Sequence, residues 1–301
     1  MLKWLKYFVS KISNQLGADT TTTTLSETIP TIVASALLEL DEGDVVRPLV
    51  TNIPFPGPGV VHQTPFIQRL TSETDDSLTS QALNSTGSDE TSPSSATVGV
   101  HGSYVQLKEI ADLGSVDSMA IVAGKLIGQS IVKRRDLDLV ALFNSFGTDQ
   151  GAAATDWTPA DLYDAYGSLR ASIAPLPYHL VVHPLHIWMS KGIASFFDNS
   201  ADALQSFGPG TVGESFTRTG FAGMVFGFNL WADANIPATS GSAVGAAISP
   251  QAIKYVLKRG MKFVIESDAP EVADKIVGSE IWGEAILRDK HGNQMTFDTV
   301  A

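Results

Sequence analysis

A long polar tract between two strand-like runs most constrains what this chain can fold into. Residues 60–70 and 97–107 each have the composition of a strand, and the segment between them is rich in Ser, Thr, Asp and Gly. A segment of this composition cannot bury a core of its own. We therefore predict that the two runs pair as an antiparallel ribbon with a soft tip.

Such a ribbon needs a partner. An isolated two-stranded ribbon is at best marginally stable in water, and its free edges and faces must be covered. The domain from which an arm projects cannot easily cover that arm. We expect another copy of the chain to cover it.

The composition of the 301 residues supports a packed core, with 44% hydrophobic and 17% charged residues. This length suits one large domain or two modest ones. The chain has no cysteine, which excludes disulfides and thiolate metal sites and fits a reducing compartment. The net charge of −12 disfavours tight, sequence-specific nucleic-acid binding, and it suits a wall that touches nucleic acid without holding it.

Residues 1–16 have the pattern of a basic amphipathic helix. This pattern fits binding to a membrane surface, or packing on another part of the protein or on a second copy. We favour packing, because no apolar run is long enough to span a membrane, and interrupting lysines argue against a signal peptide. The apolar face comprises Leu2, Leu5, Phe8, Val9, Ile12 and Leu16.

Residues 116–146 have the 3.6-residue period of a helix, which would be about 45 Å long at 1.5 Å per residue. Gly147 is a natural stop. The charged turn at 133–138 is expected to be solvated, with an i,i+4 pair between Arg134 and Asp138, or to form salt bridges between subunits. The apolar stripe comprises Val116, Met119, Ala120, Ala123, Leu126, Ile127 and Ile131, continued by Leu139, Leu142, Phe143 and Phe146.

Shorter elements follow this helix. Thr158 before Pro159 predicts a capped helix start. The further elements that we expect are a buried strand at 178–183, a helix at 185–197, an apolar strand pair at 221–231, a strand at 241–248, a turn and helix at 249–258, and strands at 262–266 and 275–299 with a hairpin turn at 289–293.

The densest group of potential metal ligands is His179, His183 and His186. On a strand the first two would lie about 13 Å apart, and Pro184 separates them from the third. Tetrahedral zinc needs convergent ligands, so we expect structural histidines and keep a metal-dependent hydrolase at this cluster as an alternative.

The stretch GPGTVGES at 208–215 has P-loop spacing, but Glu214 stands where a phosphate-binding lysine is needed. We interpret it as a glycine loop. No other catalytic motif is present, so we expect neither an enzyme nor a cofactor.

The order of these elements resembles that of the major capsid proteins of tailed double-stranded DNA bacteriophages, which have the Hong Kong 97-type fold. Local stretches are similar too, namely HLVVHPLHIWMS, GFNLWADANIP, AAISPQAIKYV and GSEIWGEAILRDKHG. The resemblance spans nearly the whole chain and implies an α+β fold. Its expected parts are an N-terminal arm at 1–48, an extended loop at 49–107, a peripheral domain with a long spine helix at 108–174, a mixed α/β axial domain at 175–257 and further peripheral strands at 258–301.

The resemblance implies a structural protein that self-assembles into pentamers and hexamers of an icosahedral head enclosing double-stranded DNA. Its expected location is the virion, with assembly in the host cytoplasm. The expected partners are copies of itself, a scaffolding protein, a portal and non-specifically contacted DNA, with a decoration or cement protein as a further candidate and no membrane. Encapsulin shells are similar in fold, so a protein nanocompartment is the alternative.

The same resemblance implies that the extended loop lies over a neighbouring subunit. We expect inter-subunit contacts at Val60, Phe66, Arg69, Val98, Tyr104, Arg134, Arg135 and Asp138. The archetype of the fold joins a lysine of this loop covalently to an asparagine, but residues 48–107 contain no lysine, so we predict no such bond. Only a few dozen residues precede the ribbon, too few for a fused scaffolding domain, so we expect a separate scaffolding protein.

Overall fold

The computed structural model of the chain describes residues 44–65, 93–108, 119–188, 192–193, 221–239, 241–268 and 273–299. Several predictions lie outside these residues, namely the N-terminal helix at 1–16, the glycine loop at 208–215 and the ribbon tip. Unit 1 of the chain comprises Met1–Asp41, Gly102–Ile131 and Met261–Ser279; unit 2 comprises Glu42–His101, Val132–Gly260 and Glu280–Ala301. None of the helices in the described part is both long and apolar enough to cross a membrane.

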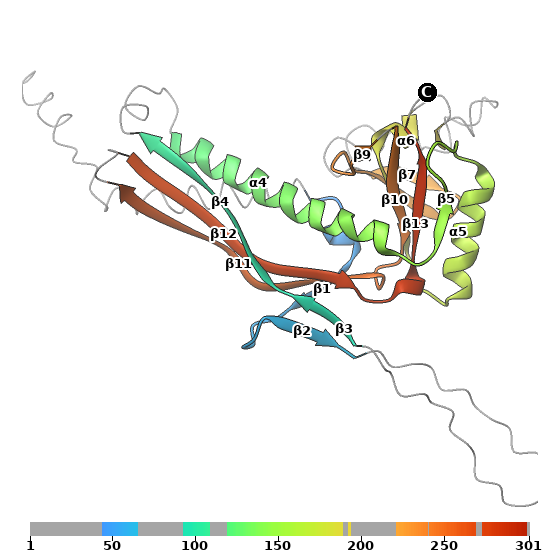
Figure 1. Ribbon diagram of the computed structural model, residues 1–301, viewed down its shortest axis with the longest axis horizontal. Coiled ribbons are helices and arrows are strands. Elements are labelled where there is room, and N and C mark those ends of the chain that lie inside the picture. The colour runs from blue at the N-terminus through green and yellow to red at the C-terminus, as the bar shows by residue number, and fades with distance from the viewer. Residues whose placement is uncertain are drawn as a thin grey trace, which may run out of the picture. The chain divides into compact units, whose positions relative to one another are not determined.

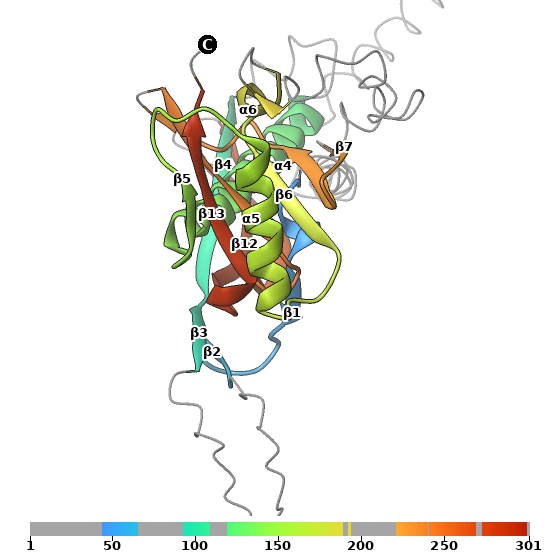
Figure 2. The same ribbon diagram turned by 90° about the vertical axis from the view of Figure 1, so that its right-hand side faces the viewer.

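A mixed sheet forms the centre of unit 2, with seven strands among the described residues (Figures 1 and 2). Its central strand β6 (Tyr178–Val182) is buried along its whole length, and this confirms the predicted buried strand. It pairs in parallel with β8 and antiparallel to β10. The strand order is β5 (Asp149–Gly151), β13 (Gly292–Asp298), β10 (Ser242–Ile248), β6, β8 (Phe228–Ala232) and β7 (Phe221–Val225), with β9 (Ala238–Thr239) beside β10.

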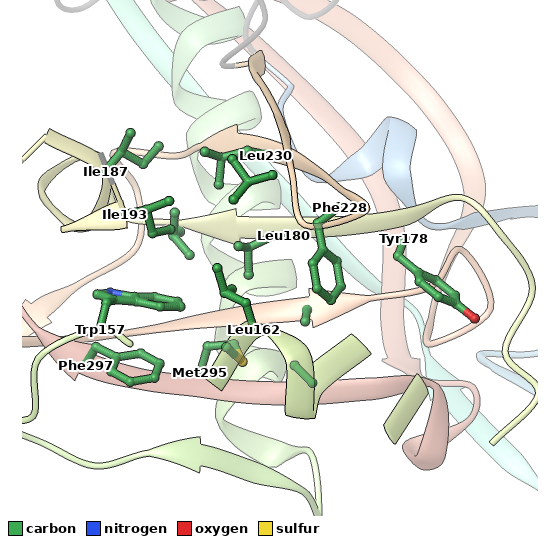
Figure 3. Close-up of a cluster of buried hydrophobic side chains, with 14 of the residues drawn as sticks. Trp157, Leu162, Tyr178, Leu180, Ile187, Ile193, Phe228, Leu230, Met295 and Phe297 are labelled. Carbon is green, nitrogen blue, oxygen red and sulfur yellow. The ribbon is translucent and has the colours of Figure 1, made fainter. Parts of the chain in front are cut away.

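Helix α5 (Pro159–Ala171) packs on this sheet over β10 and β13 (Figure 2). Its start is capped as predicted, because Asp161 accepts hydrogen bonds from the backbone N–H of Thr158 at 2.9 Å and from its hydroxyl at 2.7 Å. The apolar face of the helix meets the sheet in a core where Trp157 stacks on Phe297 with ring centroids 3.8 Å apart (Figure 3). The short helix α6 (Pro184–Trp188) begins where a longer helix was predicted.

A second sheet has four strands among the described residues, in the order β1 (Thr51–Pro54), β11 (Ile253–Asp268), β12 (Ala273–Ile286) and β4 (Gly99–Lys108). Strand β1 follows the 3₁₀ turn η1 (Arg47–Leu49) and runs parallel to β11. Of the turn and helix predicted at 249–258, the helix is wrong, because residues from Ile253 onward form β11. Ile253, Tyr255 and Val256 are all buried, and a buried β-branched and aromatic run favours a strand.

The long helix α4 (Met119–Ala141) and the 3₁₀ turn η2 (Leu142–Ser145) confirm the predicted helix over the described residues. Ala123, Ile127 and Ile131 are buried as predicted, whereas Leu126 is 52% exposed, so the apolar stripe is narrower than the sequence indicates. In unit 1 the helix approaches Gly278 so closely that a side chain there would collide with Ile127.

Two connections differ from the prediction. The ribbon consists of β2 (Val61–Thr64) and β3 (Ser94–Thr97), paired antiparallel with Val61 opposite Thr97. Residues from Gly99 onward do not pair with β2 but form β4 of the four-stranded sheet. The hairpin turn predicted at 289–293 is wrong, because η5 (Asp289–His291) joins β12 and β13, which belong to different sheets.

Candidate subunit-contact surface

The base of the ribbon is packed onto its own chain. Ala96 and Val98 are buried against Val256. The Val98 N–H donates to the Val60 carbonyl at 2.8 Å, which extends the ribbon ladder by one bond. A side chain at Gly283 of β12 would collide with the Thr97 carbonyl, so the ribbon lies directly on that strand. These contacts fix the base of the ribbon to its own chain.

Two lysines of β11 hold this base. The Lys254 ammonium donates to the hydroxyl of Thr64 at 3.0 Å and to the carbonyl of Ser94 at 2.6 Å, so it bridges both ribbon strands. Its burial lowers the pKa of Lys254. Lys258 donates to the Gly59 carbonyl and lies over the Phe55 ring, 5.1 Å from its centroid. Sequence reasoning missed both lysines, although their i,i+4 spacing places them on one face of a strand.

Three valine side chains near the ribbon base are exposed. Val60 is 62% exposed, Val61 43% and Val100 72%, and the described residues of unit 2 supply no cover for them. We call these three residues the valine patch. Exposed aliphatic side chains near the root of a ribbon can be buried by a second protein chain.

The predicted contact residues have different surroundings. Val60 belongs to the valine patch, and Tyr104 in unit 1 is 67% exposed. Val98, by contrast, is only 7% exposed because it packs beneath the ribbon in its own chain. Phe66 and Arg69 lie outside the described residues. Contacts of Val60 and Tyr104 with another subunit stay a prediction.

The charged turn of α4 has one solvated pair, as predicted. Arg134 donates to Asp138 at 2.9 Å and 3.2 Å, and the Arg134 side chain is 62% exposed. His101, stacked on Trp282 with centroids 3.9 Å apart, lies 3.9 Å from the Asp138 carboxylate. Burial and the charge of Asp138 raise the pKa of nearby Glu284 to about 7.

The prediction of a solvated turn is wrong at Arg135 and Asp136, which are 1% and 0% exposed. The Arg135 guanidinium donates to Glu280 at 3.1 Å and to both carboxylate oxygens of Asp44. We call Arg135, Asp44 and Glu280 the buried triad. Burial raises the pKa of Asp44 and of Glu280, although the charge of Arg135 acts in the opposite direction. Burial also disfavours the charged form of Arg135, but the two carboxylates outweigh this effect, so the pKa of Arg135 is raised. Arg135 thus uses its charge inside its own subunit.

The three histidines do not converge on a common point. His179 accepts a hydrogen bond from the Trp231 indole at 3.1 Å, and His183 accepts one from the Leu185 N–H at 3.2 Å. His186 is buried with its Nε2 3.2 Å from the Phe297 carbonyl, and burial lowers its pKa to about 4. The described residues contain no group of three or more His, Asp or Glu side chains that could hold a metal ion. Each histidine has a structural contact, and the hydrolase alternative receives no support.

No protein-family model matches the sequence, and no curated protein matches it significantly. The fold, however, is similar to that of solved phage heads. The head structure of Helicobacter pylori bacteriophage KHP40 matches with a TM-score of 0.59 and 8% identity, over 86% of this chain and 91% of that one. The capsid of cyanophage P-SCSP1u matches with a TM-score of 0.55 and 15% identity, over 83% and 86%. A virus-like particle from Pyrococcus furiosus matches with a TM-score of 0.54 and 13% identity, over 88% and 97%.

These likenesses extend over most of each chain and confirm the fold predicted from the sequence. The chain has the α+β fold of Hong Kong 97-type capsid proteins, with the long helix, the ribbon and the mixed sheet that the resemblance implied.

Proposed function

We propose that this chain, which has the Hong Kong 97-type fold, is the major subunit of an icosahedral phage head that encloses double-stranded DNA. The observation that carries the proposal is the ribbon: its base is fixed to its own chain, whereas its valine patch is exposed. A shell supplies the missing cover by placing a second copy against each ribbon. Burial of apolar surface at about 25 cal/mol per Å², repeated around a closed lattice, would stabilise the assembly.

Within this proposal residues 49–107 form the loop that reaches the next subunit, 108–174 hold the spine helix and 175–257 form the axial domain. Strand β13 pairs with β10 in the mixed sheet, and the assignment of 258–301 to the peripheral domain stays a prediction. The subunit carries no catalytic role in this assignment. Scaffolding, portal and cement partners stay predictions.

A second candidate is an encapsulin-like compartment with protein cargo, because the fold is similar to that of a virus-like particle from Pyrococcus furiosus as well as to that of phage heads. The cargo of purified particles distinguishes the phage head from the compartment. We expect particles purified from infected cells to contain double-stranded DNA, detected by nuclease-sensitive absorbance and by gel after disruption. Particles that contain one defined enzyme and no nucleic acid would favour the compartment.

The shell is expected to lack covalent cross-links between subunits. Residues 48–107 contain no lysine, so the extended loop cannot supply the amine of a lysine–asparagine isopeptide bond. Mature particles boiled in detergent should run as a single band of 32.0 kDa on a denaturing gel. A ladder of higher multiples that survives boiling would contradict this expectation.

A further inference from the structure

Two buried carboxylates of unit 2 accept hydrogen bonds from the same residue, Asn235. Asp136 on α4 is 0% exposed, and Asp233, which follows β8, is 2% exposed. Burying one ionised carboxylate is costly, and burying two in contact is costlier unless something compensates their charge. The question is what neutralises them.

The hydrogen bonds around the pair leave one oxygen without a donor. Asp136 accepts from the Val46 N–H at 3.2 Å and from the Asn235 side chain at 2.9 Å. Asp233 accepts through Oδ1 from the Asn235 N–H at 2.8 Å. Its other oxygen, Oδ2, is buried and has no partner among the described residues. Because Asn235 binds both carboxylates, it holds them side by side.

The charged groups described near the pair do not neutralise it. On α4 the neighbouring Arg135 is already engaged by Asp44 and Glu280. The turn after β8 contributes the neutral Asn235, and β6 contributes the Val182 carbonyl, which accepts from the Asp233 N–H at 3.0 Å. Burial, followed by the charge and hydrogen bond of Asp136, raises the pKa of Asp233 to about 8, although the Asn235 N–H lowers it.

We propose that Asp136 and Asp233 bind one proton between them, carried on Asp233 Oδ2 and donated to Asp136. This proton supplies the missing donor and removes one of the two charges. It also links three segments of unit 2. Asp136 on α4 accepts a hydrogen bond from the Val46 N–H, and Asp233 lies in the turn between β8 and β9. We call this pair the carboxyl latch. The inference depends on packing within one chain, so it stands or falls independently of the proposed shell function.

The latch should make stability fall as pH rises. A carboxyl whose pKa is raised in the folded state binds more protons there than in the unfolded state, at every pH between the two pKa values. For Asp233 this interval runs from about 4, the ordinary value of an aspartate, to about 8 in the folded chain. Within it the unfolding equilibrium constant rises by up to about tenfold per pH unit, and above it the contribution of this pair levels off.

The test compares the pH profile of unfolding of the native chain with that of Asp233→Asn. An asparagine amide donates to Asp136 as the protonated carboxyl does and cannot ionise, so the variant should lose this slope and become relatively more stable with each step from pH 4 to pH 8. Asp164→Asn is the matched control, since it removes the same charge from an exposed position of α5 and should leave the profile unchanged. Parallel profiles of the native chain and Asp233→Asn would overturn the proposal.

Two further measurements on the native chain do not depend on the variant folding. Infrared spectra in heavy water at about pH 8 should contain a protonated-carboxyl band that disappears above pH 9, and absence of that band at pH 8 would contradict a bound proton. Glu284, whose pKa is about 7, is mostly ionised at pH 8 and does not supply the band. Calcium should leave the melting temperature unchanged. A calcium-dependent rise that Asp233→Asn abolishes would show that a cation, not a proton, neutralises the pair.

Discussion

Replacing Arg135 with methionine is expected to lower the free energy of unfolding by about 3–5 kcal/mol. The guanidinium is the central charge of the buried triad, and its removal leaves the carboxylates of Asp44 and Glu280 buried without their shared partner. The pKa of both carboxyls is raised even in the presence of Arg135, because burial costs their charged forms more than Arg135 returns. Chemical denaturation of the chain at neutral pH measures the loss.

Arg134→Met is the matched control, because the same substitution one residue earlier removes only an exposed i,i+4 pair with Asp138. Such pairs contribute about 0.5 kcal/mol or less. Simultaneous apolar replacement of Arg135, Asp44 and Glu280 should recover most of the loss, since no unpaired charge then remains in the interior. Equal effects of the Arg134 and Arg135 substitutions would mean that the triad does not hold the helix to its neighbours.

Removing the ribbon tip is expected to abolish shell formation without unfolding the subunit. If residues 66–92 are replaced by a short Gly-Ser linker, the base contacts of Lys254, Lys258 and Val98 remain. The melting temperature should therefore change little, while electron micrographs of material expressed under assembly conditions should show no closed particles.

A variant with residues 66–92 in shuffled order is the control for this deletion. It keeps the length and charge of the tip and changes only its contacts, so it should also fail to assemble. Closed shells from the deletion variant would show that the tip is dispensable and that the exposed valine patch is covered in another way.

The sequence predicted those parts of the fold that depend on local patterns. The long helix shows its 3.6-residue period, the capped start of α5 requires only Thr158, Pro159 and Asp161, and the central strand β6 has three successive aliphatic residues, Leu180–Val182. Each of these signals lies within a few residues, so no knowledge of distant partners was needed.

The failures occur where a distant residue determines the outcome. Arg135 and Asp136 look like a solvated turn because their partners lie far away in the sequence, with Asp44 at a separation of 91 residues and Glu280 at 145. The segment 289–293 has the composition of a hairpin turn, but its flanking strands pair with partners in two different sheets. Local composition cannot indicate which strand will be the neighbour.

The contact surface was predicted in part. The ribbon follows from its polar tract, and Val60 is exposed as a contact residue must be. Val98 has the same apolar character in the sequence but is buried, because the chain folds it against Val256. The sequence alone does not distinguish an aliphatic residue that is buried within its own chain from one that is exposed and available for contact with another subunit.

Sedimentation of the purified chain tests the central claim, that the subunit is completed by other copies of itself. We expect pentamers, hexamers or closed shells that sediment far faster than a single chain of 32.0 kDa. A monomer that stays stable at every concentration tested, with residues 66–92 protected from protease by their own chain, would contradict it.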